Sequence, residues 1–491
     1  MNACFKHWDK TLIAVIAASL LFSFWLMFAT FSYSEGSMVI ASKAWSDFAA
    51  NIPLIRSFSL GENFPPEYPI FPSSPIHYHF LFYFLVGMLE KIGLKIDWAL
   101  NIPSALGFTG LLIMIYIFAK KLFSSKKVAV LSLIFFLFNG SLSSINFFKI
   151  YGFSYNLLTQ ITKLSTFPSF GPYDNSIVSA FWNLNIYTNQ RHLALSFAIS
   201  LFIILLSISS FIKQHKIKYG LLLGLLLGVF FFFHFAVFLM TVVILSLLFS
   251  LIPSSRTSIF IILAVTAIVF LPQYLYLQTG GSNFKLSFVP GYLISNDLNA
   301  INFIKYWFFN LGLHFVLIPV GFFLSPPKAK KILLAFFTLF IIGNTLQFSP
   351  EMASNHKFFN YFMIVGSMFS AYFLFRLWKH HRILKPLTIL LFFILIFSGI
   401  IDFFPIYNDS KIRVEDYPIN KDVSWIIQST PPNSIFLNTS YIYDPASLAG
   451  RKIFMGWPYF AWSTGYDTTL RFETMKEILG AKNYLRQWQP S

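Results

Sequence analysis

The feature that most constrains this chain is a series of apolar runs, each about 20 residues long, that recurs along most of its length. An α-helix of about that length crosses the hydrocarbon core of a bilayer. Of the 491 residues, 56% are hydrophobic and only 11% are charged, a balance outside the range of soluble globular domains. The sequence therefore predicts an all-α polytopic membrane protein.

The basic residues decide how the runs alternate across the membrane, because cytoplasmic loops carry an excess of Lys and Arg. No small-residue cleavage site follows the first run, so we expect it to be a retained helix and not a signal peptide. The clusters expected in the cytoplasm are Lys6/Lys10, Lys120/Lys121/Lys126/Lys127, Lys213/Lys216/Lys218, Arg256, Lys328/Lys330/Lys331 and Lys379/Arg382/Lys385. About eleven transmembrane helices place them all on one side, near 12–31, 98–119, 128–148, 192–212, 218–234, 236–252, 257–277, 304–324, 332–348, 358–376 and 387–404.

Two apolar stretches need separate treatment. The stretch 78–89 is too short to cross a bilayer and ends in a charged Glu-Lys pair, so we expect a juxtamembrane helix. The stretch 218–252 is too long for one crossing and has basic residues at both ends. It therefore predicts two shorter helices that turn near His234, and this histidine is more often a turn cap than a catalytic group.

We expect the protein to lie in the plasma membrane. This alternation places its N-terminus in the cytoplasm and its polar segments outside the cell. We expect a transmembrane domain over 1–405, whose first outer loop, 32–97, carries juxtamembrane helices. The C-terminal region 406–491 is more polar, and the turn signals PPNS, NTS and DPAS separate short apolar pieces. That pattern predicts a small extracytoplasmic α+β region.

The net charge of +17 does not indicate a nucleic-acid partner. The basic residues lie mostly in short loops between apolar runs, where the positive-inside rule accounts for them. The single cysteine, Cys4, excludes an intramolecular disulfide and a CxxC metal site.

The first outer loop holds the most informative carboxylate. Asp47 lies in WSDFAANIPLIRSF, whose apolar spacing suits a helix on the membrane surface. Five prolines stiffen the return path, namely Pro65, Pro66, Pro69, Pro72 and Pro75. A rigid loop that holds one carboxylate at the interface suits a general base, since proton transfer requires hydrogen-bond reach. A solvated loop aspartate is the alternative.

The residues around Asp47 carry a family resemblance. A first helix is followed by an outer loop with Asp47 and an amphipathic turn, then by GENFPPEYP, an aromatic helix, and NIPSALG at the start of the next span. This order resembles the membrane glycosyltransferases of the GT-C fold, and within them bacterial members distantly similar to the protein mannosyltransferases and the lipid A aminoarabinose transferase. The resemblance covers residues 1–120, and the later helices only by layout. It implies a GT-C-like fold and a catalytic acidic residue that corresponds to Asp47.

The loop also departs from that family. Many members carry Asp-Glu or Asp-x-Asp, whereas Phe48 and Ala49 follow Asp47 here. A hard divalent cation usually takes more than one protein oxygen, so either Glu67 or Glu62 supplies a second carboxylate or no metal is used. The pair His77-x-His79 suggests zinc, but no third ligand follows at a metalloenzyme spacing. We therefore assign no metal ligand, and expect substrate contact or interfacial packing from Glu67, His77 and His79.

Two further polar sites are candidate substrate contacts on the outer side. Gln190, Arg191 and His192 come together where a span begins, as interfacial anchors or as ligands of a sugar or phosphate. Lys357 breaks the positive-inside pattern at the start of another span, where it either reaches lipid head groups or binds an anion such as a lipid phosphate.

The outer tail supplies the last candidates. Arg451 precedes an aromatic run, Trp457, Tyr459, Trp462 and Tyr466, in SLAGRKIFMGWPYFAWSTGYD. These aromatic side chains either pack the region against the membrane face or stack on sugar rings.

These observations predict a hexosyltransferase that moves a sugar from a polyprenyl-phosphate donor to a glycan, lipid or protein acceptor on the outer face of the membrane. Asp47 is the expected base, and Lys357 and Arg191 are expected to stabilise the departing phosphate. The chain has no P-loop and no GxGxxG after a strand, so no nucleotide-sugar site is expected. The alternatives are a transporter or flippase for a lipid-linked saccharide, and a non-catalytic membrane scaffold.

Overall fold

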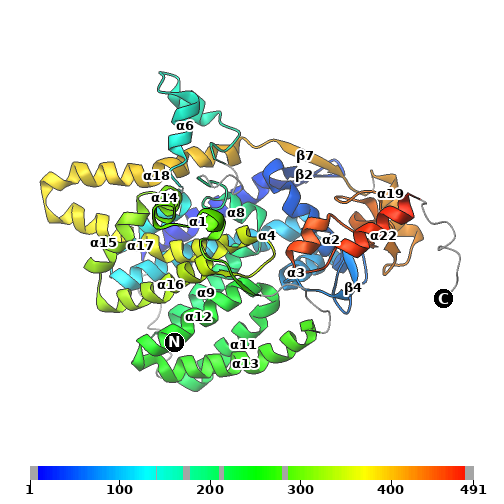
Figure 1. Cartoon of the computed structure of the whole chain (residues 1–491), viewed down its shortest axis with the longest axis horizontal. Coiled ribbons are helices and arrows are strands. Elements are labelled where there is room, and N and C mark those ends of the chain that lie inside the picture. Colours follow the sequence, from blue (N-terminus) through cyan, green and yellow to red (C-terminus); the bar gives the residue numbers. More distant parts are fainter. Residues whose placement is uncertain are drawn as a thin grey trace.

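The computed structural model describes residues 9–139, 141–169, 177–209, 215–278, 286–417 and 419–480. Long helices fill the left and centre of Figure 1, and a smaller mixed module lies at the right. The helices of the larger part are α1 (Lys10–Thr30), α4 (Ile96–Phe123), α5 (Lys126–Leu137), α6 (Ser144–Tyr151), α7 (Leu157–Thr162), α8 (Asn185–Asn189), α9 (Leu193–Ser207), α11 (Lys216–Phe233), α12 (Phe235–Leu251), α13 (Arg256–Gln278), α14 (Ala300–Leu311), α15 (His314–Leu324), α16 (Pro327–Thr345), α17 (His356–His380) and α18 (Lys385–Tyr407). A two-stranded sheet of β5 (Ser287–Phe288) and β6 (Leu346–Gln347) joins two of the loops between them.

Among the described residues, six helices are long and apolar enough to cross a membrane, namely α1, α4, α11, α13, α17 and α18. Helices α9 and α12 are apolar but shorter, and α14 and α15 form a pair bent by 87°. These helices confirm the prediction of a helical, multi-pass membrane protein. The count of eleven spans is not confirmed by length and composition and stays a prediction.

Two expected spans are interrupted helices. The stretch 128–148 breaks after α5, where the Asn139 side chain donates a hydrogen bond of 2.7 Å to the Trp182 carbonyl. The stretch 304–324 breaks between α14 and α15 at Gly312, whose φ of 57° is a conformation that favours glycine. The two-helix turn expected at His234 is confirmed, because this residue lies between α11 and α12.

A row of small residues lets two of the membrane helices approach closely. Gly220, Gly224 and Gly228 recur at a spacing of four and therefore lie on one face of α11. A Cβ at Gly224 would lie 2.6 Å from the Cβ of Val265 on α13, so only glycine permits this contact. Small residues at a constant spacing are a common means of packing helices in lipid.

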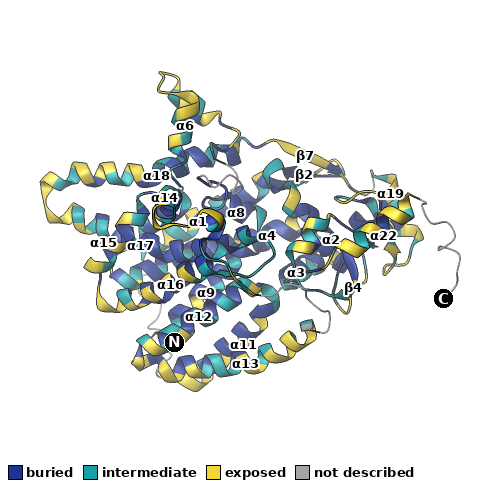
Figure 2. Ribbon diagram, viewed as in Figure 1, coloured by how far each residue is buried: buried dark blue, intermediate teal, exposed yellow. Residues whose placement is uncertain are grey.

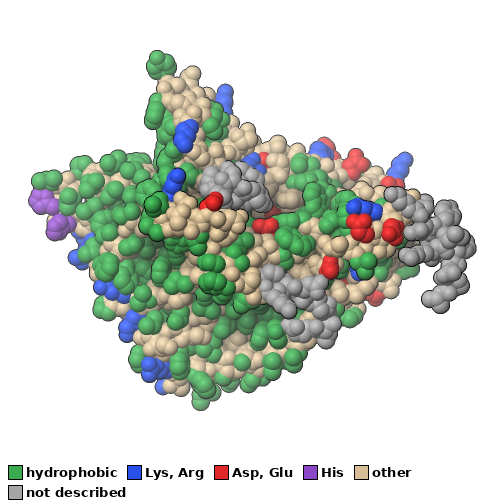
Figure 3. All heavy atoms as spheres, viewed as in Figure 1, with side chains coloured by type: hydrophobic (Ala, Val, Ile, Leu, Met, Phe, Trp, Pro, Cys, Tyr) green, Lys and Arg blue, Asp and Glu red, His purple; other side chains and the backbone are tan. Residues whose placement is uncertain are grey.

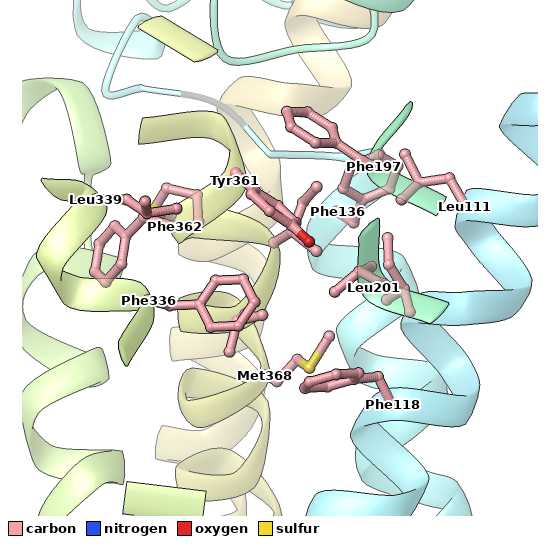
Figure 4. Packing of buried hydrophobic residues seen from close by; sticks show 14 of the residues in the cluster. Leu111, Phe118, Phe136, Phe197, Leu201, Phe336, Leu339, Tyr361, Phe362 and Met368 are labelled. Carbon is pink, nitrogen blue, oxygen red and sulfur yellow. The ribbon is translucent and has the colours of Figure 1, made fainter. Parts of the chain in front are cut away.

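The core of the larger part lies around α17. Figure 4 shows side chains of α4, α16 and α17 meeting, among them Phe118, Phe336 and Met368. Helix α17 also packs against α5 and α15. Inside a bilayer this packing stabilises mainly through van der Waals contact, because lipid tails are as apolar as the side chains.

The smaller module combines the first outer loop with the C-terminal region. Strand β2 (Ser37–Ala41) pairs antiparallel with both β1 (Phe31–Ser34) and β7 (Lys411–Glu415). The other elements are α2 (Trp45–Ser59), β3 (Glu67–Tyr68), β4 (Phe71–Pro75), α3 (Leu81–Lys91), α19 (Lys421–Ser429), β8 (Ile435–Phe436), α20 (Pro445–Leu448), β9 (Lys452–Ile453), α21 (Pro458–Ser463) and α22 (Thr469–Leu479). One hydrophobic cluster contains side chains from residues 31–100 and from residues 414–475. The expected α+β region thus shares its core with the first outer loop.

Helix α3 has the length expected of a juxtamembrane helix, 11 residues. It packs against α2 and α4, and Glu90 in its last turn is buried. The C-terminal region approaches the end of α2 closely, since a Cβ on Gly61 would lie 2.1 Å from the Gly450 carbonyl oxygen. Both contacts fix the position of α2 within the module.

The surfaces of the two parts differ. Figure 2 shows long exposed stretches on the outer helices of the larger part, and Figure 3 shows that hydrophobic side chains cover this surface. Acidic side chains gather on the module at the right, and basic ones line the opposite edge of the helices. An apolar exterior of this kind is typical of helices that contact lipid.

Candidate functional site

Asp47 lies in the first turn of α2, and its side chain is half-buried. The carboxylate makes no hydrogen bond or ion pair with any residue that the structure describes. Burial raises the pKa of the Asp47 carboxyl to about 6, although the nearby Lys357 ammonium acts in the opposite direction. A carboxyl group with such a pKa is ionised at neutral pH and still basic enough to accept a proton.

Lys357 lies in the first turn of α17, 310 positions along the chain from Asp47, and is also half-buried. The charges of Lys357 and Asp47 are close enough to interact, but the two groups form no ion pair within 4.0 Å. Lys357 also makes no hydrogen bond with any described residue. Two oppositely charged groups therefore lie within electrostatic reach of each other, and neither has a direct partner in the described chain.

Tyrosine side chains surround the carboxylate. The Tyr443 hydroxyl donates a hydrogen bond of 2.7 Å to the Trp45 carbonyl oxygen, and its ring lies 4.1 Å from the Trp45 ring. Burial, and then the Asp47 charge, raises the pKa of the Tyr443 and Tyr78 hydroxyls. These phenols therefore stay protonated at neutral pH, next to the carboxylate.

Three histidines from distant parts of the chain meet beside Lys357. The Nε2 atoms of His79 and His192 are 2.7 Å apart, and the Tyr83 hydroxyl lies 2.9 Å from Nδ1 of His192. The ring of His234 lies 4.6 Å from that of His79 and nearly parallel to it. Burial lowers the pKa of His79, and the His192, His234 and Lys357 groups add to this effect.

Two other expected contacts have polar atoms that are buried without a partner in the described chain. One is the Oε1 atom of Gln190, and the others are both ring nitrogens of His77. The His77 ring stacks on Tyr466 at 4.3 Å, and His77 is not part of the cluster that His79 forms with His192 and His234. Substrate contact by Gln190 and His77 stays a prediction.

Arg191 is fully buried and bonded within the protein. Its Nη2 donates to Thr30 Oγ1 at 2.8 Å, and its Nη1 to Asn101 Oδ1 at 3.2 Å. The guanidinium also lies over the Phe48 ring. Arg191 therefore ties α1, α4 and α2 together one residue before His192. Its expected contact with the donor phosphate stays a prediction.

Arg451 has a similar internal position. Its guanidinium donates to the carbonyl oxygens of Leu60, Ala449 and Thr430 at 2.8 to 2.9 Å. These bonds link the end of α2 to the C-terminal elements, which is a positioning role. Direct substrate contact by Arg451 also stays a prediction.

Glu67 lies at a second location in the module. Its Oε2 forms an ion pair of 2.6 Å with Lys452. Both side chains line a pocket of about 490 Å³, together with Glu62 and Lys91. The carboxylate of Glu67 is thus neutralised by a lysine. A cation shared between Asp47 and Glu67 or Glu62 stays a prediction.

The aromatic run of the tail is mostly at the surface. Trp457, Tyr459 and Trp462 are exposed, whereas Tyr466 is buried between β4 and His77. The Tyr459 hydroxyl donates to Glu351 in the loop before α17. Contact of the exposed rings with lipid or with sugar stays a prediction.

Sequence reasoning did not select the residues that complete the site. Tyr443 contacts Trp45 from 398 positions away, and no local pattern marks it. Tyr83 is one aromatic residue in the apolar helix α3, where its spacing is that of core packing. The sequence context of His234 predicts a turn cap, and its Nδ1 atom accepts a long hydrogen bond of 3.5 Å from the Val237 amide.

No protein-family model matches the chain, and no curated protein matches it in sequence. Among solved structures, it is similar to the crystal structure of the oligosaccharyltransferase of Archaeoglobus fulgidus in complex with Zn and sulfate. The two chains are 13% identical, with a TM-score of 0.49, and the match covers 90% of this chain and 62% of the other. The chain thus spans less than two thirds of that protein's length. A likeness at this TM-score assigns neither a family nor an activity, so the function is argued from the site.

Proposed function

We propose that the chain is a membrane glycosyltransferase of the hexosyltransferase type, with a GT-C-like arrangement of about eleven spans. It uses a polyprenyl-phosphate-linked sugar as donor and a glycan, lipid or protein as acceptor on the outer face of the plasma membrane. Asp47 is the general base, and Lys357 binds the donor phosphate.

The observation that carries the proposal is the meeting of Asp47 and Lys357. Sequence reasoning selected them separately, one as a base and one as an anion ligand, and they lie within electrostatic reach of each other. Neither side chain has a hydrogen bond or ion pair within the described chain. Both are half-buried at the junction of the module with the membrane helices. A donor with its lipid in the membrane and its sugar outside has to be bound at such a junction.

The transfer is a single displacement with inversion at the anomeric carbon. The acceptor hydroxyl oxygen forms a bond to the anomeric carbon and gives its proton to the Asp47 carboxylate. The bond between the anomeric carbon and the phosphate oxygen breaks, and the phosphate leaves with the electron pair. The negative charge that develops on the phosphate lies near the Lys357 ammonium, which stabilises it.

The first test replaces Asp47 by Asn, which has nearly the same shape but takes no proton at neutral pH. We expect turnover per folded molecule to fall by at least about 100-fold, since general-base catalysis contributes roughly 10²–10⁴-fold. Turnover is measured as sugar release from a panel of synthetic polyprenyl-phosphate-linked hexoses in proteoliposomes, with cell-envelope extract as the source of acceptors.

The same assay gives a pH dependence. Because Asp47 acts in its ionised form and its pKa is about 6, kcat/KM should reach half of its neutral-pH value near pH 6, and should fall about tenfold per pH unit at lower pH.

The matched control is Asp97→Asn. Asp97 also lies in the first turn of a helix, but it accepts hydrogen bonds from the backbone amides of Tyr33 and Trp98. This variant should lose thermal stability while the turnover of the folded fraction is unchanged. Near-normal turnover of Asp47→Asn would remove the catalytic assignment. A loss of stability with normal turnover would make Asp47 a structural residue.

A further inference from the structure

We propose that His79, His192 and His234 form a binding site for a divalent transition metal ion, with Zn²⁺ as the best-matched ion. One ring nitrogen of each histidine lies within 4.8 Å of the other two. The sequence contains only the pair His77-x-His79 as a local hint, and His77 is not part of the cluster. The inference does not depend on the proposed transfer reaction.

The three imidazoles come from separate elements that the fold brings together. His79 lies in the loop before α3, His192 precedes α9, and His234 separates α11 from α12. His192 and His234 are each 1% exposed, and His79 is half-buried. Each ring is anchored by a different part of the fold, so the ring nitrogens have little freedom to move. A preformed metal site requires ligands that are held in place in this way.

The hydrogen bonds around the cluster suit metal ligation. A metal-bound histidine usually donates its other ring N–H to a second residue, which fixes the tautomer. The Tyr83 hydroxyl lies 2.9 Å from Nδ1 of His192 and can accept that bond, which leaves Nε2 for the metal. Tyr83 is buried in α3, so its hydroxyl is held in place.

The second observation is a polar atom that lacks a partner. The Nε2 atom of His234 is buried and makes no hydrogen bond with the described residues. A buried polar atom without a partner costs about 1–3 kcal/mol. Ligation of a cation by this atom, shared with His79 and His192, removes that cost. The ring proton then lies on Nδ1 of His234, so the long hydrogen bond that Nδ1 accepts from the Val237 amide is lost.

The geometry requires a small adjustment. Zinc–nitrogen bonds of about 2.0–2.1 Å in a tetrahedral site place two ligand nitrogens about 3.3 Å apart. The Nε2 atoms of His79 and His192 are 2.7 Å apart, so they must separate by about 0.6 Å as their hydrogen bond is replaced by two metal bonds. The wider separations in the cluster, up to 4.8 Å, must close by up to about 1.5 Å to reach the same spacing. His79 is half-buried in a loop, so its ring is the one with the most room to move.

Three neutral imidazoles match zinc and leave one coordination position open. Neutral imidazole is the form of histidine that binds metal. The cluster lies close enough to Lys357 for their charges to interact. A bound dication would therefore lie beside the group that we assign to the donor phosphate, although this consequence rests on the proposed function.

The experiment uses the full-length protein, purified in detergent with a tag that contains no histidine and treated with a chelator. Titration with ZnCl₂ against a zinc-sensitive dye should give one equivalent of tight binding. Titration with CoCl₂ should give the visible absorption of tetrahedral cobalt. Tyr83 would hydrogen-bond to a metal ligand, so we expect Tyr83→Phe to weaken zinc binding by ~10–100-fold. His79→Gln and His192→Gln each remove a ligand and should weaken zinc binding by more than that.

The matched control is His314→Gln. His314 is also 1% exposed and has an unpartnered Nε2 atom among the described residues, but it stands away from the cluster and bonds to Ser370. Zinc binding should be unchanged in this variant. The proposal is overturned if the wild type binds no more zinc than the double variant His79→Gln/His192→Gln, or if His314→Gln loses as much binding. If the histidine variants do not fold, the test rests on two other measurements. An unchanged zinc affinity in Tyr83→Phe together with no tetrahedral cobalt spectrum in the wild type would then overturn the proposal.

Discussion

At the scale of single residues, the helix dipole distinguishes Asp47 from Lys357. The N-terminus of a helix carries a partial positive charge, which stabilises an anion and opposes a cation. Asp47 in the first turn of α2 agrees with this rule, so its position alone has a structural explanation. Lys357 in the first turn of α17 violates it, and no acidic side chain pairs with it in the described chain. A cation kept at an unfavourable position is better explained by a bound anion.

The prediction for Lys357 follows from this conflict. Lys357→Gln should weaken the binding of a polyprenyl phosphate by roughly 1.5–3 kcal/mol, the scale of a hydrogen bond to a charged group. The same variant should change the free energy of unfolding by less than about 1 kcal/mol, because removal of the unfavourable charge from the helix end offsets the lost attraction to Asp47. Binding is measured by titration of the purified protein, and stability by thermal unfolding in the same detergent.

Lys305→Gln is the control for this measurement. Lys305 is an exposed lysine of α14, where a side chain reaches solvent or lipid head groups. It should bind the lipid phosphate as the wild type does. Equal binding by Lys357→Gln would make Lys357 a head-group anchor, and a large loss of stability would make it a structural residue.

The sequence revealed those site residues that are out of place in their surroundings. Asp47 is an isolated carboxylate after an apolar run, and Lys357 is a lysine on the side that has few. Tyr443 and His234 gave no such signal, because a tyrosine in a polar tail and a histidine at a turn are ordinary there. The position of Arg191 in the sequence suggests a phosphate ligand, which stays a prediction. The structure adds that its guanidinium is hydrogen-bonded to Thr30 and Asn101 and lies over the Phe48 ring, contacts that the sequence does not indicate.

At the scale of elements, a buried ion cluster joins α2, α3 and the C-terminal region. Arg56 pairs with Glu90 of α3 at 3.1 Å and with Asp416 after β7 at 2.6 Å. All three side chains are almost fully buried, and Ser59 donates a further bond to Glu90. Since α2 also carries Asp47, this cluster fixes the helix that holds the proposed base.

Removal of Arg56 should therefore be severely destabilising. Arg56→Met leaves two buried carboxylates without their cation, and loss of one partner from a buried ion pair costs about 3–5 kcal/mol. The measurement is the free energy of unfolding of the purified protein in denaturant. Arg413→Met is the control, because Arg413 and Glu35 form an exposed pair whose loss should cost no more than about 1 kcal/mol. Equal, small effects in both variants would exclude the assigned role of the buried cluster.

Sequence patterns predicted most membrane helices, because hydrophobic length is a local property. The breaks after α5 and between α14 and α15 were missed, since a single asparagine or glycine in an apolar stretch does not decide whether a helix ends. The pairing of β2 with β7 was also not predicted. It joins residues at least 370 positions apart, and the sequence of β7 (KIRVE) has no feature that indicates its partner.

At the scale of the whole molecule, the sheet β1–β2–β7 constrains the membrane topology. Strands β2 and β7 are hydrogen-bonded, so they lie on the same side of the membrane. The chain between them must then cross the bilayer an even number of times. Of the six long apolar helices, five lie between these strands, an odd number, so these helices alone do not account for the crossings. Ten crossings, as in the eleven-span prediction, satisfy the requirement.

The topology prediction is that the first outer loop and the C-terminal region are both extracytoplasmic, and it is tested by cysteine labelling in a Cys4→Ser background. Glu62→Cys and Lys421→Cys replace exposed residues of the module, and Lys127→Cys replaces an exposed residue of the basic edge that we expect in the cytoplasm. A membrane-impermeant maleimide added to intact cells should label the first two positions, and Lys127→Cys only after permeabilisation. Labelling of Glu62→Cys without Lys421→Cys would contradict the β2–β7 pairing. Labelling of Lys127→Cys alone would reverse the orientation, and would place the proposed site on the cytoplasmic face, where nucleotide sugars are available and a lipid-linked donor is no longer required.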